Sequence, residues 1–434
     1  MKPKLKIAIV NRSIYYSGGI EYFGYNLANW LADRGHQVLV LSRPPFEPSH
    51  QPVIPLRSEI LHRHFTPPDY LATREILLNF DADLCIAMYS SAEVLFWVQA
   101  LFSTGIPLLY SERNKPEIIE NEWWNRKERQ MLLGISDSIH VMIPEFTQSI
   151  PLSLQKRIRI IPHFSRFPTK PPPTATRQIR KILSLGRLDP QKQLHLLISA
   201  FELIHSRFPN WKVEIWGAGA VEQSLLEMII EKKLSHCISL NGETRTPENQ
   251  FQSADLFCIP SKFEGFGNTV VEAMSHSLPV VGFAECSGVN WIVQDGVNGV
   301  LAPEMTAESL AQALSKLMGD DELRQKMSDA ALVRAADFDK ETILTQWEEM
   351  IYECVSHKGN TALQRALAEL EDPESNAAHL NLLWRLNATF EERMEYFSYP
   401  LIQYVHYKRN KWFVKWPWKI ILKLWRIKNR IRKR

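Results

Sequence analysis

The chain has 434 residues, 51 Lys and Arg against 48 Asp and Glu, a formal net charge of +3, and 45% apolar residues. This length is typical of two or three domains, and the ordinary apolar and charged fractions exclude wholesale disorder, collagen-like repetition and a small disulfide-stapled protein. Five widely spaced cysteines without a Cys-x-x-Cys pair indicate reduced core residues and a cytoplasmic location. No apolar run approaches the roughly 20 residues that span a bilayer, and the N-terminal run is too short for a signal-peptide core.

Strand and helix patterns alternate through the first part of the chain. A β-branched, apolar run predicts a strand at residues 4–10, and apolar residues at four-residue spacing predict a helix at 20–34. Gly35 is placed to end this helix, and the next strand is predicted at 36–42. Further strands are predicted at 84–87, 107–110 and 138–143.

Prolines cluster at residues 162–176, which predicts a linker between two domains. A second alternating series follows, with strands predicted at 181–185, 212–216, 239–240, 256–259 and 279–282, and helices at 194–207, 221–232, 307–318 and 321–336. Such alternation is typical of parallel α/β sheets. We therefore predict an α/β fold with an N-terminal domain at 1–165, a second domain at 166–357, a cleft between them, and a helical extension at 358–434.

Paired glycines, Gly18 and Gly19, fall between the first strand and the first helix. Glycine lets the backbone approach a ligand closely, and the helix start behind it favours an anion. A plain strand-to-helix turn explains the same pair equally well.

Two further turns in the second domain carry candidate binding residues. Arg187 and Lys192 follow a predicted strand, where a planar donor fork and a point charge could clamp a diphosphate; two solvated surface cations are the alternative. Gly217 opens an incomplete dinucleotide fingerprint, because Glu222 replaces its third glycine. We interpret that turn as a tight strand-to-helix connection near bound nucleotide.

The segment at 261–274 is the most informative. Glu264 lies in a loop after a predicted strand, and Glu272 lies two turns into the following helix, so the two carboxylates occupy different depths of one pocket. Residues 265–269 bring backbone amides to the helix start, where a diphosphate gains from hydrogen bonds and from the helix dipole. A solvated pair of glutamates beside an ordinary helix is the less favoured explanation.

These motifs together resemble family 4 retaining glycosyltransferases of the GT-B fold over about residues 4–355. The resemblance rests on Glu264 and Glu272 separated by seven residues in an E-G-F-G…E-A context, on G-R-x₄-K at 186–192, on D-G-x-N-G at 295–299, and on Gly18-Gly19. It implies two Rossmann-like domains facing a cleft, with a nucleotide sugar, UDP-linked by family expectation, held mainly by the second domain.

The resemblance also implies a role for each residue. Arg187 and Lys192 would neutralise the leaving diphosphate, Glu272 would bind the ribose, and Glu264 would contact the donor sugar. Among the remaining binding residues, backbone amides around Phe266, Gly267 and Asn268 would also touch the donor sugar, amides near Thr269 and Val270 the phosphates, and Gly19 would approach the diphosphate. No metal or other cofactor is required, because positioning and fixed charge carry the catalysis.

One segment departs from the family. Many relatives place a histidine after the strand predicted at 107–110, whereas this chain has Arg113 and Asn114 there. Either residue could position donor or acceptor, or only shape the loop, and we assign Arg113 to the catalytic group with Glu264, Arg187 and Lys192. His140, within a predicted strand, is expected to be a core residue. Asp81 and Asp83 are expected to form a helix-to-strand turn and no metal site.

The C-terminal segment at 405–434 has 12 Lys and Arg and no acidic residue, so the other 404 residues sum to −9. Apolar residues at helical spacing, tryptophans and a basic stripe predict a helix lying on an anionic membrane surface. Docking on the acidic body is a second interpretation, and nucleic-acid binding is the least favoured. We therefore expect peripheral association with the inner face of the cell membrane.

The predicted activity is transfer of a sugar from a nucleotide sugar to a lipid-linked or polysaccharide acceptor in cell-surface glycan synthesis, such as that of lipopolysaccharide. The alternatives are a sugar-nucleotide epimerase or a phosphorylase of GT-B-like fold, and a non-catalytic sugar-nucleotide-binding protein. A phosphorylase often uses a pyridoxal lysine, for which the sequence has no distinctive signal.

Overall fold

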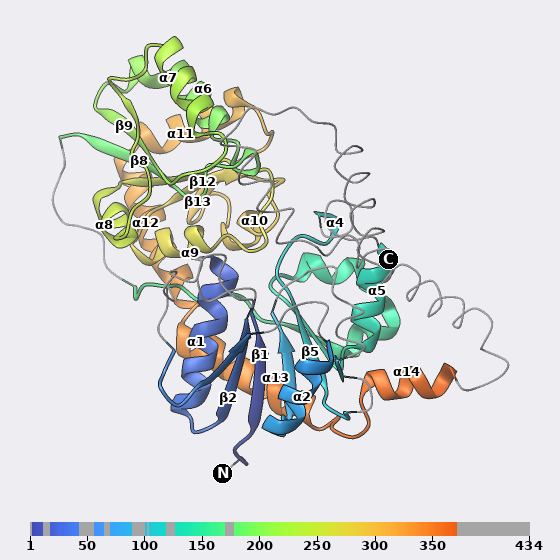
Figure 1. Ribbon diagram of the computed structural model, residues 1–434. Coiled ribbons are helices and arrows are strands. Elements are labelled where there is room, and N and C mark those ends of the chain that lie inside the picture. The colour runs from blue at the N-terminus through green and yellow to red at the C-terminus, as the bar shows by residue number, and fades with distance from the viewer. Residues whose placement is uncertain are drawn as a thin grey trace, which may run out of the picture.

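Short runs of buried apolar residues form two parallel sheets in the computed structural model, which describes residues 2–11, 18–42, 56–64, 70–88, 100–101, 104–118, 126–169 and 178–370. Figure 1 shows the first sheet in the lower domain and the second in the upper domain. The predicted α/β class with two sheets is confirmed. The basic segment at 405–434, the rest of 371–434 and the prolines at 171–173 lie outside the described residues.

The first sheet has the strand order β3-β2-β1-β4-β5-β6-β7, and every neighbouring pair is parallel. Its strands are β1 (Lys6–Val10), β2 (Gln37–Ser42), β3 (Leu61–His64), β4 (Leu84–Ala87), β5 (Leu108–Glu112), β6 (Ser138–Val141) and β7 (Ile158–Ile160). The described helices that accompany it are α1 (Gly19–Asp33), α2 (Tyr70–Phe80), α4 (Pro116–Ile118) and α5 (Arg126–Ile135), with 3₁₀ turns η2 (Pro144–Ser149) and η3 (Leu152–Arg157).

The second sheet has the order β10-β9-β8-β11-β12-β13, again with parallel neighbours. Its strands are β8 (Arg180–Leu185), β9 (Trp211–Trp216), β10 (Ile238–Leu240), β11 (Leu256–Ile259), β12 (Val280–Phe283) and β13 (Gly299–Ala302). Its helices are α6 (Leu194–Ile204), α7 (Glu222–Glu231), α8 (Pro247–Ser253), α9 (Asn268–Ser275), α10 (Val289–Ile292), α11 (Ala307–Met318) and α12 (Asp321–Ala336), with 3₁₀ turns η4 (Pro190–Lys192) and η5 (His205–Arg207).

Both sheets reverse their strand order once, between β1 and β4 in the first and between β8 and β11 in the second. In doubly wound sheets, ligands bind outside the carboxyl ends of the strands at this reversal. The topology therefore places a candidate site at the carboxyl edge of each sheet.

Helix α13 (Lys340–Val355) follows the second domain in sequence but packs on the first sheet (Figure 1). The Trp347 ring lies 5.1 Å from the Phe23 ring of α1 and 4.5 Å from the His140 ring of β6. Trp30 Nε1 of α1 also donates a hydrogen bond of 2.8 Å to Glu341. The chain therefore crosses between the domains twice. The domain boundaries predicted at residues 165 and 357 remain predictions.

Helix α14 (Ala362–Leu370) continues from α13 and packs on α5. The amide of Ala362 donates a hydrogen bond of 2.6 Å to Asp137, at the turn between α5 and β6. The part of the extension that the structure describes is therefore helical and attached to the first domain.

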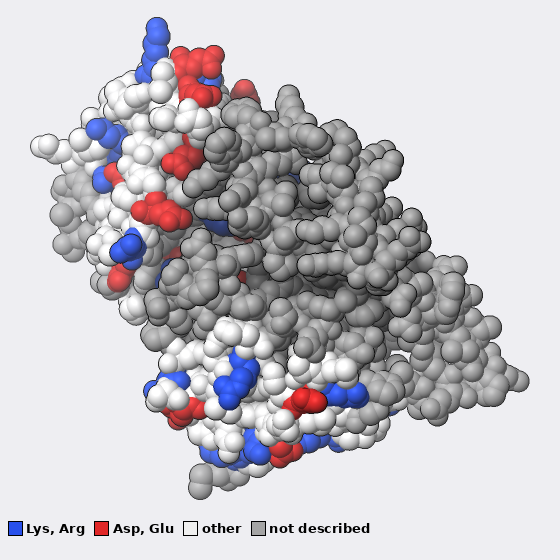
Figure 2. Space-filling model, in the orientation of Figure 1, with Lys and Arg blue, Asp and Glu red and all other residues white. Residues whose placement is uncertain are grey.

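All five cysteines are buried and unpaired, as predicted for core residues. No described helix is both long and apolar enough to cross a bilayer. On the face in Figure 2, the described Lys and Arg side chains are interspersed with Asp and Glu.

Candidate active site

The carboxyl edges of the two sheets face each other at close range. Gly19 is the first residue of α1 and Asn268 is the first residue of α9, and a Cβ added to Gly19 would overlap the Asn268 Nδ2 atom. A Cβ on Gly265 would lie 2.5 Å from the carbonyl oxygen of Arg113. Glycine at both positions therefore allows the two domains to approach each other.

Two helix N-termini meet at this point. Gly18 and Gly267 occupy the N-cap positions of α1 and α9, and the φ angle of +99° at Gly267 is one that a glycine adopts without strain. Each helix start carries N–H groups without intrahelical acceptors and a partial positive charge. The junction between the domains is thus a favourable position for an anion.

The side chains that follow Gly267 point in different directions. Asn268 and Thr269 are half-buried, and the buried Asn268 Oδ1 has no hydrogen-bond partner in the described part of the chain. Val270 is fully buried in the domain core. The phosphate contacts predicted near Thr269 and Val270 come from backbone amides, and burial of the Val270 side chain is compatible with that prediction.

Lys192 and Glu264 form an ion pair of 2.7 Å between Nζ and Oε1, with side chains that are 17% and 11% exposed. The neighbouring Gln191 holds their two loops together, because its side chain donates to the Phe263 carbonyl at 2.8 Å and its carbonyl accepts from the Lys262 amide at 2.9 Å. Lys192 therefore has a fixed position beside Glu264, as its assignment to one site requires.

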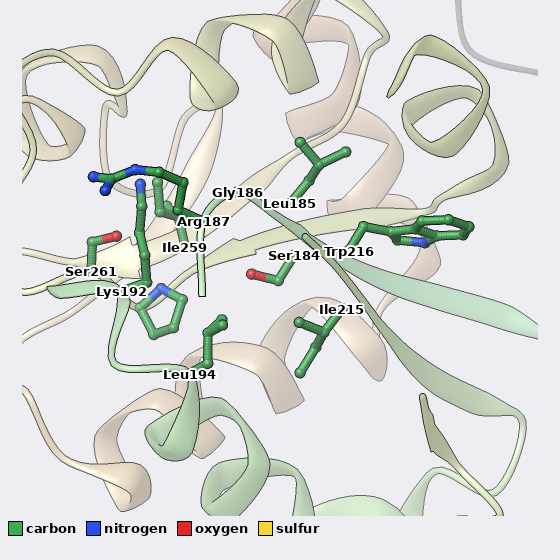
Figure 3. Close-up of a pocket in the computed structure, with 11 residues that line it drawn as sticks. Ser184, Leu185, Gly186, Arg187, Lys192, Leu194, Ile215, Trp216, Ile259 and Ser261 are labelled. Carbon is green, nitrogen blue, oxygen red and sulfur yellow. The ribbon is translucent and has the colours of Figure 1, made fainter. Parts of the chain in front are cut away.

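Arg187 has a different environment from Lys192. Its side chain is 72% exposed and pairs with Asp189 in its own loop. Figure 3 shows Arg187 and Lys192 among the residues that line a pocket in the second domain, together with Ser261. The structure thus brings Lys192 to Glu264 and leaves Arg187 at the rim.

Gly217 has a steric explanation that the sequence did not indicate. With a φ of +140°, its Cα faces the backbone of the β8 loop, and a Cβ there would overlap the carbonyl oxygen of Gly186. A Cβ on Gly219 would likewise overlap the carbonyl oxygen of Leu188. These two glycines allow the loops after β8 and β9 to pack together, and a nucleotide contact at Gly217 remains a proposal.

The Phe266 side chain is buried in an aromatic cluster. Its ring lies 6.0 Å from Trp291, 5.7 Å from Phe338 and 6.2 Å from His163. Any contact of Phe266 with a donor sugar would therefore come from its backbone. The ring anchors the loop that carries Glu264.

Glu272 is only 5% exposed and pairs with Arg166, whose Nε lies 3.3 Å from Glu272 Oε1. Burial raises the pKa of Glu272 to about 7, and the charge of Arg166 opposes that rise. The sequence singled out Glu272 but not Arg166, which lies in an irregular segment after β7 with no periodic pattern to mark it.

Arg113 is a buried cation without an acidic partner among the described residues. It is 5% exposed, its Nε and Nη2 atoms are buried without hydrogen-bond partners, and its guanidinium lies 4.0 Å from the Phe23 ring centroid. Burial lowers its pKa to about 9. The neighbouring Asn114 accepts a hydrogen bond from the Lys115 amide, which shapes the loop.

Two buried histidines lie near Arg113. His140, fully buried in β6, accepts from or donates to Ser111 Oγ at 2.9 Å and donates to the Ile161 carbonyl at 2.7 Å, as expected for a core residue. His163 was not singled out by the sequence; its ring contacts the carbonyls of Phe164 and Gly19. Burial, followed by the charge of Arg113, lowers the pKa of His163 to about 3, so both rings are neutral near pH 7.

The other motifs are structural. Asp81 and Asp83 precede β4 at the amino edge of the first sheet, where Lys6 and Lys358 pair with them. No cluster of metal-binding side chains is present among the described residues. In the turn at 295–299, Asp295 accepts from the Leu301 amide and Asn298 accepts from the Gln294 amide.

Two doubly wound domains with facing carboxyl edges define the GT-B class of fold, and comparison with known proteins agrees. The HepE protein of Anabaena, solved with UDP and glucose, superposes with a TM-score of 0.65 at 19% identity, covering 80% of this chain and 99% of that one. The predicted GT-B fold is confirmed.

Sequence comparisons give the family. The family model described as Glycosyltransferase Family 4 matches residues 17–141, and the one described as Glycosyl transferases group 1 matches residues 170–334. An uncharacterized glycosyltransferase of Haemophilus influenzae is 24% identical over 353 residues, covering 80% of this chain and 99% of the relative. Together the two models match more than half of the chain, which belongs to glycosyltransferase family 4.

Another match covers only part of each protein. The N-acetylgalactosamine-N,N'-diacetylbacillosaminyl-diphospho-undecaprenol 4-alpha-N-acetylgalactosaminyltransferase of Campylobacter jejuni is 33% identical over 159 residues. The match covers 37% of this chain and 43% of that relative. The shared part is therefore less than half of either protein.

Proposed function

We propose that this glycosyltransferase retains anomeric configuration while moving a hexosyl group from a UDP-sugar to a lipid-linked or polysaccharide acceptor in cell-surface glycan synthesis. The observation that carries the proposal is the meeting of the N-termini of α1 and α9, at Gly19 and Asn268, where the carboxyl edges of the two sheets face each other. Two positive helix ends that meet at one point favour a diphosphate. The UDP in HepE and the diphospho-undecaprenol acceptor named for the Campylobacter relative support the choice of substrates.

In this proposal the fixed charges stabilise the leaving group. The bond between the anomeric carbon and the phosphate oxygen breaks as negative charge develops on the diphosphate, and the helix ends and Lys192 lie on the domain surfaces that meet there. The exposed Arg187 side chain would exchange its ion pair with Asp189 for contact with the same charge. These groups supply the neutralisation without a metal or another cofactor.

Retention follows if the acceptor attacks on the face that the phosphate leaves. The acceptor oxygen forms the new bond to the anomeric carbon, and the departing phosphate oxygen takes the proton of the acceptor hydroxyl. Glu264 holds the donor sugar through its hydroxyl groups and keeps Lys192 in position through the ion pair. Arg113, with its unpaired donors at the end of β5, contacts a charged or polar group of donor or acceptor.

The basic segment at 405–434 supplies the membrane attachment in this proposal. Its 12 cations and interspersed tryptophans suit the headgroup region of an anionic bilayer on the cytoplasmic side, where lipid-linked acceptors are available. The mixture of acidic and basic side chains on the described part of the face in Figure 2 gives no specific support to docking of this segment on the enzyme body.

The test is a transfer reaction with purified protein, a set of UDP-sugars and polyprenyl-diphosphate-linked acceptors, with the anomeric configuration of the product read by NMR. We expect one donor to be used and its configuration to be kept. Inversion, or full activity in both the Glu264→Ala and Lys192→Ala variants, would refute the proposal.

A further inference from the structure

Three residues from different parts of the chain contact one another where the two domains meet. Tyr22 lies on α1, Arg166 lies in the segment that joins the two domains, and Glu272 lies on α9. The Arg166 guanidinium carbon is 4.7 Å from the Tyr22 ring centroid, and its Nε is 3.3 Å from Glu272 Oε1. Arg166 therefore links the first domain to a carboxylate of the second.

The surroundings of Glu272 make this contact important. The Glu272 side chain is 6% exposed and that of Arg166 is 33% exposed, so the carboxylate is taken from water while the cation is not. With Arg166 in place the pKa of Glu272 is about 7, and without this cation the pKa would be higher, so that less of the side chain would be ionised at neutral pH.

Other titratable groups near Glu272 do not replace Arg166. Tyr22 faces it from α1, and burial raises the pKa of this tyrosine, so it is neutral. On α9, the His276 ring contacts the backbone carbonyl of Glu272. The carboxylate of Glu248, on α8, faces this ring, with 4.0 Å between Glu248 Oε1 and His276 Nε2.

The protonation state of Glu272 decides what it can bind. An ionised carboxylate has two acceptor oxygens and can accept from both hydroxyls of a ribose cis-diol, whereas a protonated one keeps a hydrogen that competes for one of those positions. Arg166 acts on this carboxylate through its charge, because the Nε atom that approaches Glu272 makes no hydrogen bond within the described part of the chain.

We propose that Arg166 is a positioning residue for donor binding, which favours the ionised carboxylate of Glu272 and thereby makes recognition depend on the ribose 2′-hydroxyl. This inference rests on the proposed function, a transferase that uses a nucleotide-sugar donor, and on the ribose contact that the family resemblance implies for Glu272. It assigns to the interdomain segment a direct part in the selection of ribonucleotide over deoxyribonucleotide donors.

Calorimetric titration tests the inference without requiring the sugar or the acceptor. The probes are UDP, GDP, ADP and their 2′-deoxy counterparts, titrated into the wild type and the Arg166→Gln and Arg166→Lys variants between pH 6 and pH 9. For the nucleotide that the wild type binds, we expect Arg166→Gln to weaken affinity about fivefold at pH 7, because a rise of about one unit from a pKa of about 7 lowers the ionised fraction of Glu272 from about one half to about one tenth. The ratio of ribo to deoxy affinity should fall toward one.

The pH dependence gives the distinguishing signature. Without Arg166 the pKa of Glu272 rises further, so the carboxylate and the ribose preference should return as the pH is raised from 7 to 9. Arg166→Lys, which keeps the charge, should retain most of the affinity and preference. Arg180→Gln is the matched control. It removes an arginine that pairs with Asp321 at the amino edge of the second sheet, and it should change neither the affinity nor the ribose preference.

Three outcomes would contradict the inference. Wild-type affinity and preference in Arg166→Gln across this pH range would overturn it, and so would an equal, pH-independent loss for ribo and deoxy nucleotides. Failure of the wild type to bind any of these nucleotides would instead overturn the proposed donor class, and the inference with it. Thermal unfolding of each variant establishes that it is folded.

Discussion

The ammonium group of Lys192 lies 2.7 Å from the carboxylate of Glu264, so one ion pair joins the cation proposed for the diphosphate to the acid proposed for the donor sugar. Both side chains are mostly buried, and removal of either one leaves the other with an uncompensated charge. The two residues therefore act as a unit, and their effects on donor binding should be strongly coupled.

Gly217 provides a test of the loop packing that frames the site. Gly217→Ala should destabilise the protein by several kcal/mol, because its Cβ would overlap the carbonyl of Gly186 at a φ of +140°. Chemical denaturation measures the change. Gly134→Ala is the matched control, since this helical glycine has open space around its Cα, and the change should be neutral or stabilising by up to about 1 kcal/mol. Equal stability of the two variants would contradict this explanation.

Arg113 should show opposite effects on stability and activity. Arg113→Met removes a buried cation without an acidic partner, so the free energy of unfolding should be unchanged or about 1 kcal/mol higher, while transfer falls at least tenfold. Denaturation and initial rates measure the two effects.

Arg129 supplies the contrast to Arg113. It is equally buried but donates to Glu112 at 2.8 and 2.7 Å, so Arg129→Met should cost about 3–5 kcal/mol. If Arg113→Met lost as much stability as Arg129→Met and kept full transfer activity, Arg113 would have a structural role only.

Glu272 should make stability depend on pH. Its pKa of about 7 in the folded protein lies above the ordinary value of 4.5, so its contribution to stability is fully present below pH 4.5 and is lost as the pH rises through 7. Because glutamine does not ionise, Glu272→Gln should gain stability relative to the wild type between pH 4.5 and pH 8, by up to about 3 kcal/mol. Urea unfolding of the wild type and of Glu272→Gln at pH 4.5 and at pH 8 measures this. If the difference in the free energy of unfolding between the two proteins is the same at both pH values, the raised pKa of Glu272 is refuted.

Residues 405–434 are expected to bind the membrane. Removal of these residues should abolish cosedimentation with vesicles that contain anionic lipid, while the full chain should bind and be released by high salt, because the cations act through a screened surface potential. Vesicles of neutral lipid are the control. Unchanged binding of the shortened chain would exclude this attachment.

Much of the fold was predictable because strong local patterns dominate it. The bounds predicted for α11 and α12 agree with the structure, and Thr306 and Asp320 cap their N-termini by accepting the amides of Ser309 and Leu323. The short strands β3, β7 and β13 were not predicted. β3, for example, contains two histidines and an arginine and is defined by its pairing with β2.

Long-range relationships were less accessible from the sequence. The periodic pattern of a helix marks its buried face but not which sheet it will cover, so the return of α13 to the first domain was not predicted. For the same reason, the sequence indicated Glu272 through its motif and gave no sign of Arg166. Lys192 and Glu264 were expected on one sheet edge because both follow strands whose carboxyl ends share it, and the structure pairs them at 2.7 Å. Their common role in donor binding stays a prediction.

Thermal unfolding with a panel of nucleotide sugars tests the central claim most directly, in the wild type and in the Glu264→Ala and Lys192→Ala variants. A donor present at 100 times its dissociation constant stabilises the folded protein by about 2.7 kcal/mol, which raises the unfolding temperature by several degrees. We predict that one UDP-sugar produces this rise in the wild type, and that both variants remain folded and show little or none of it. Absence of a rise with every nucleotide sugar, or an equal rise in all three proteins, would contradict the proposed site.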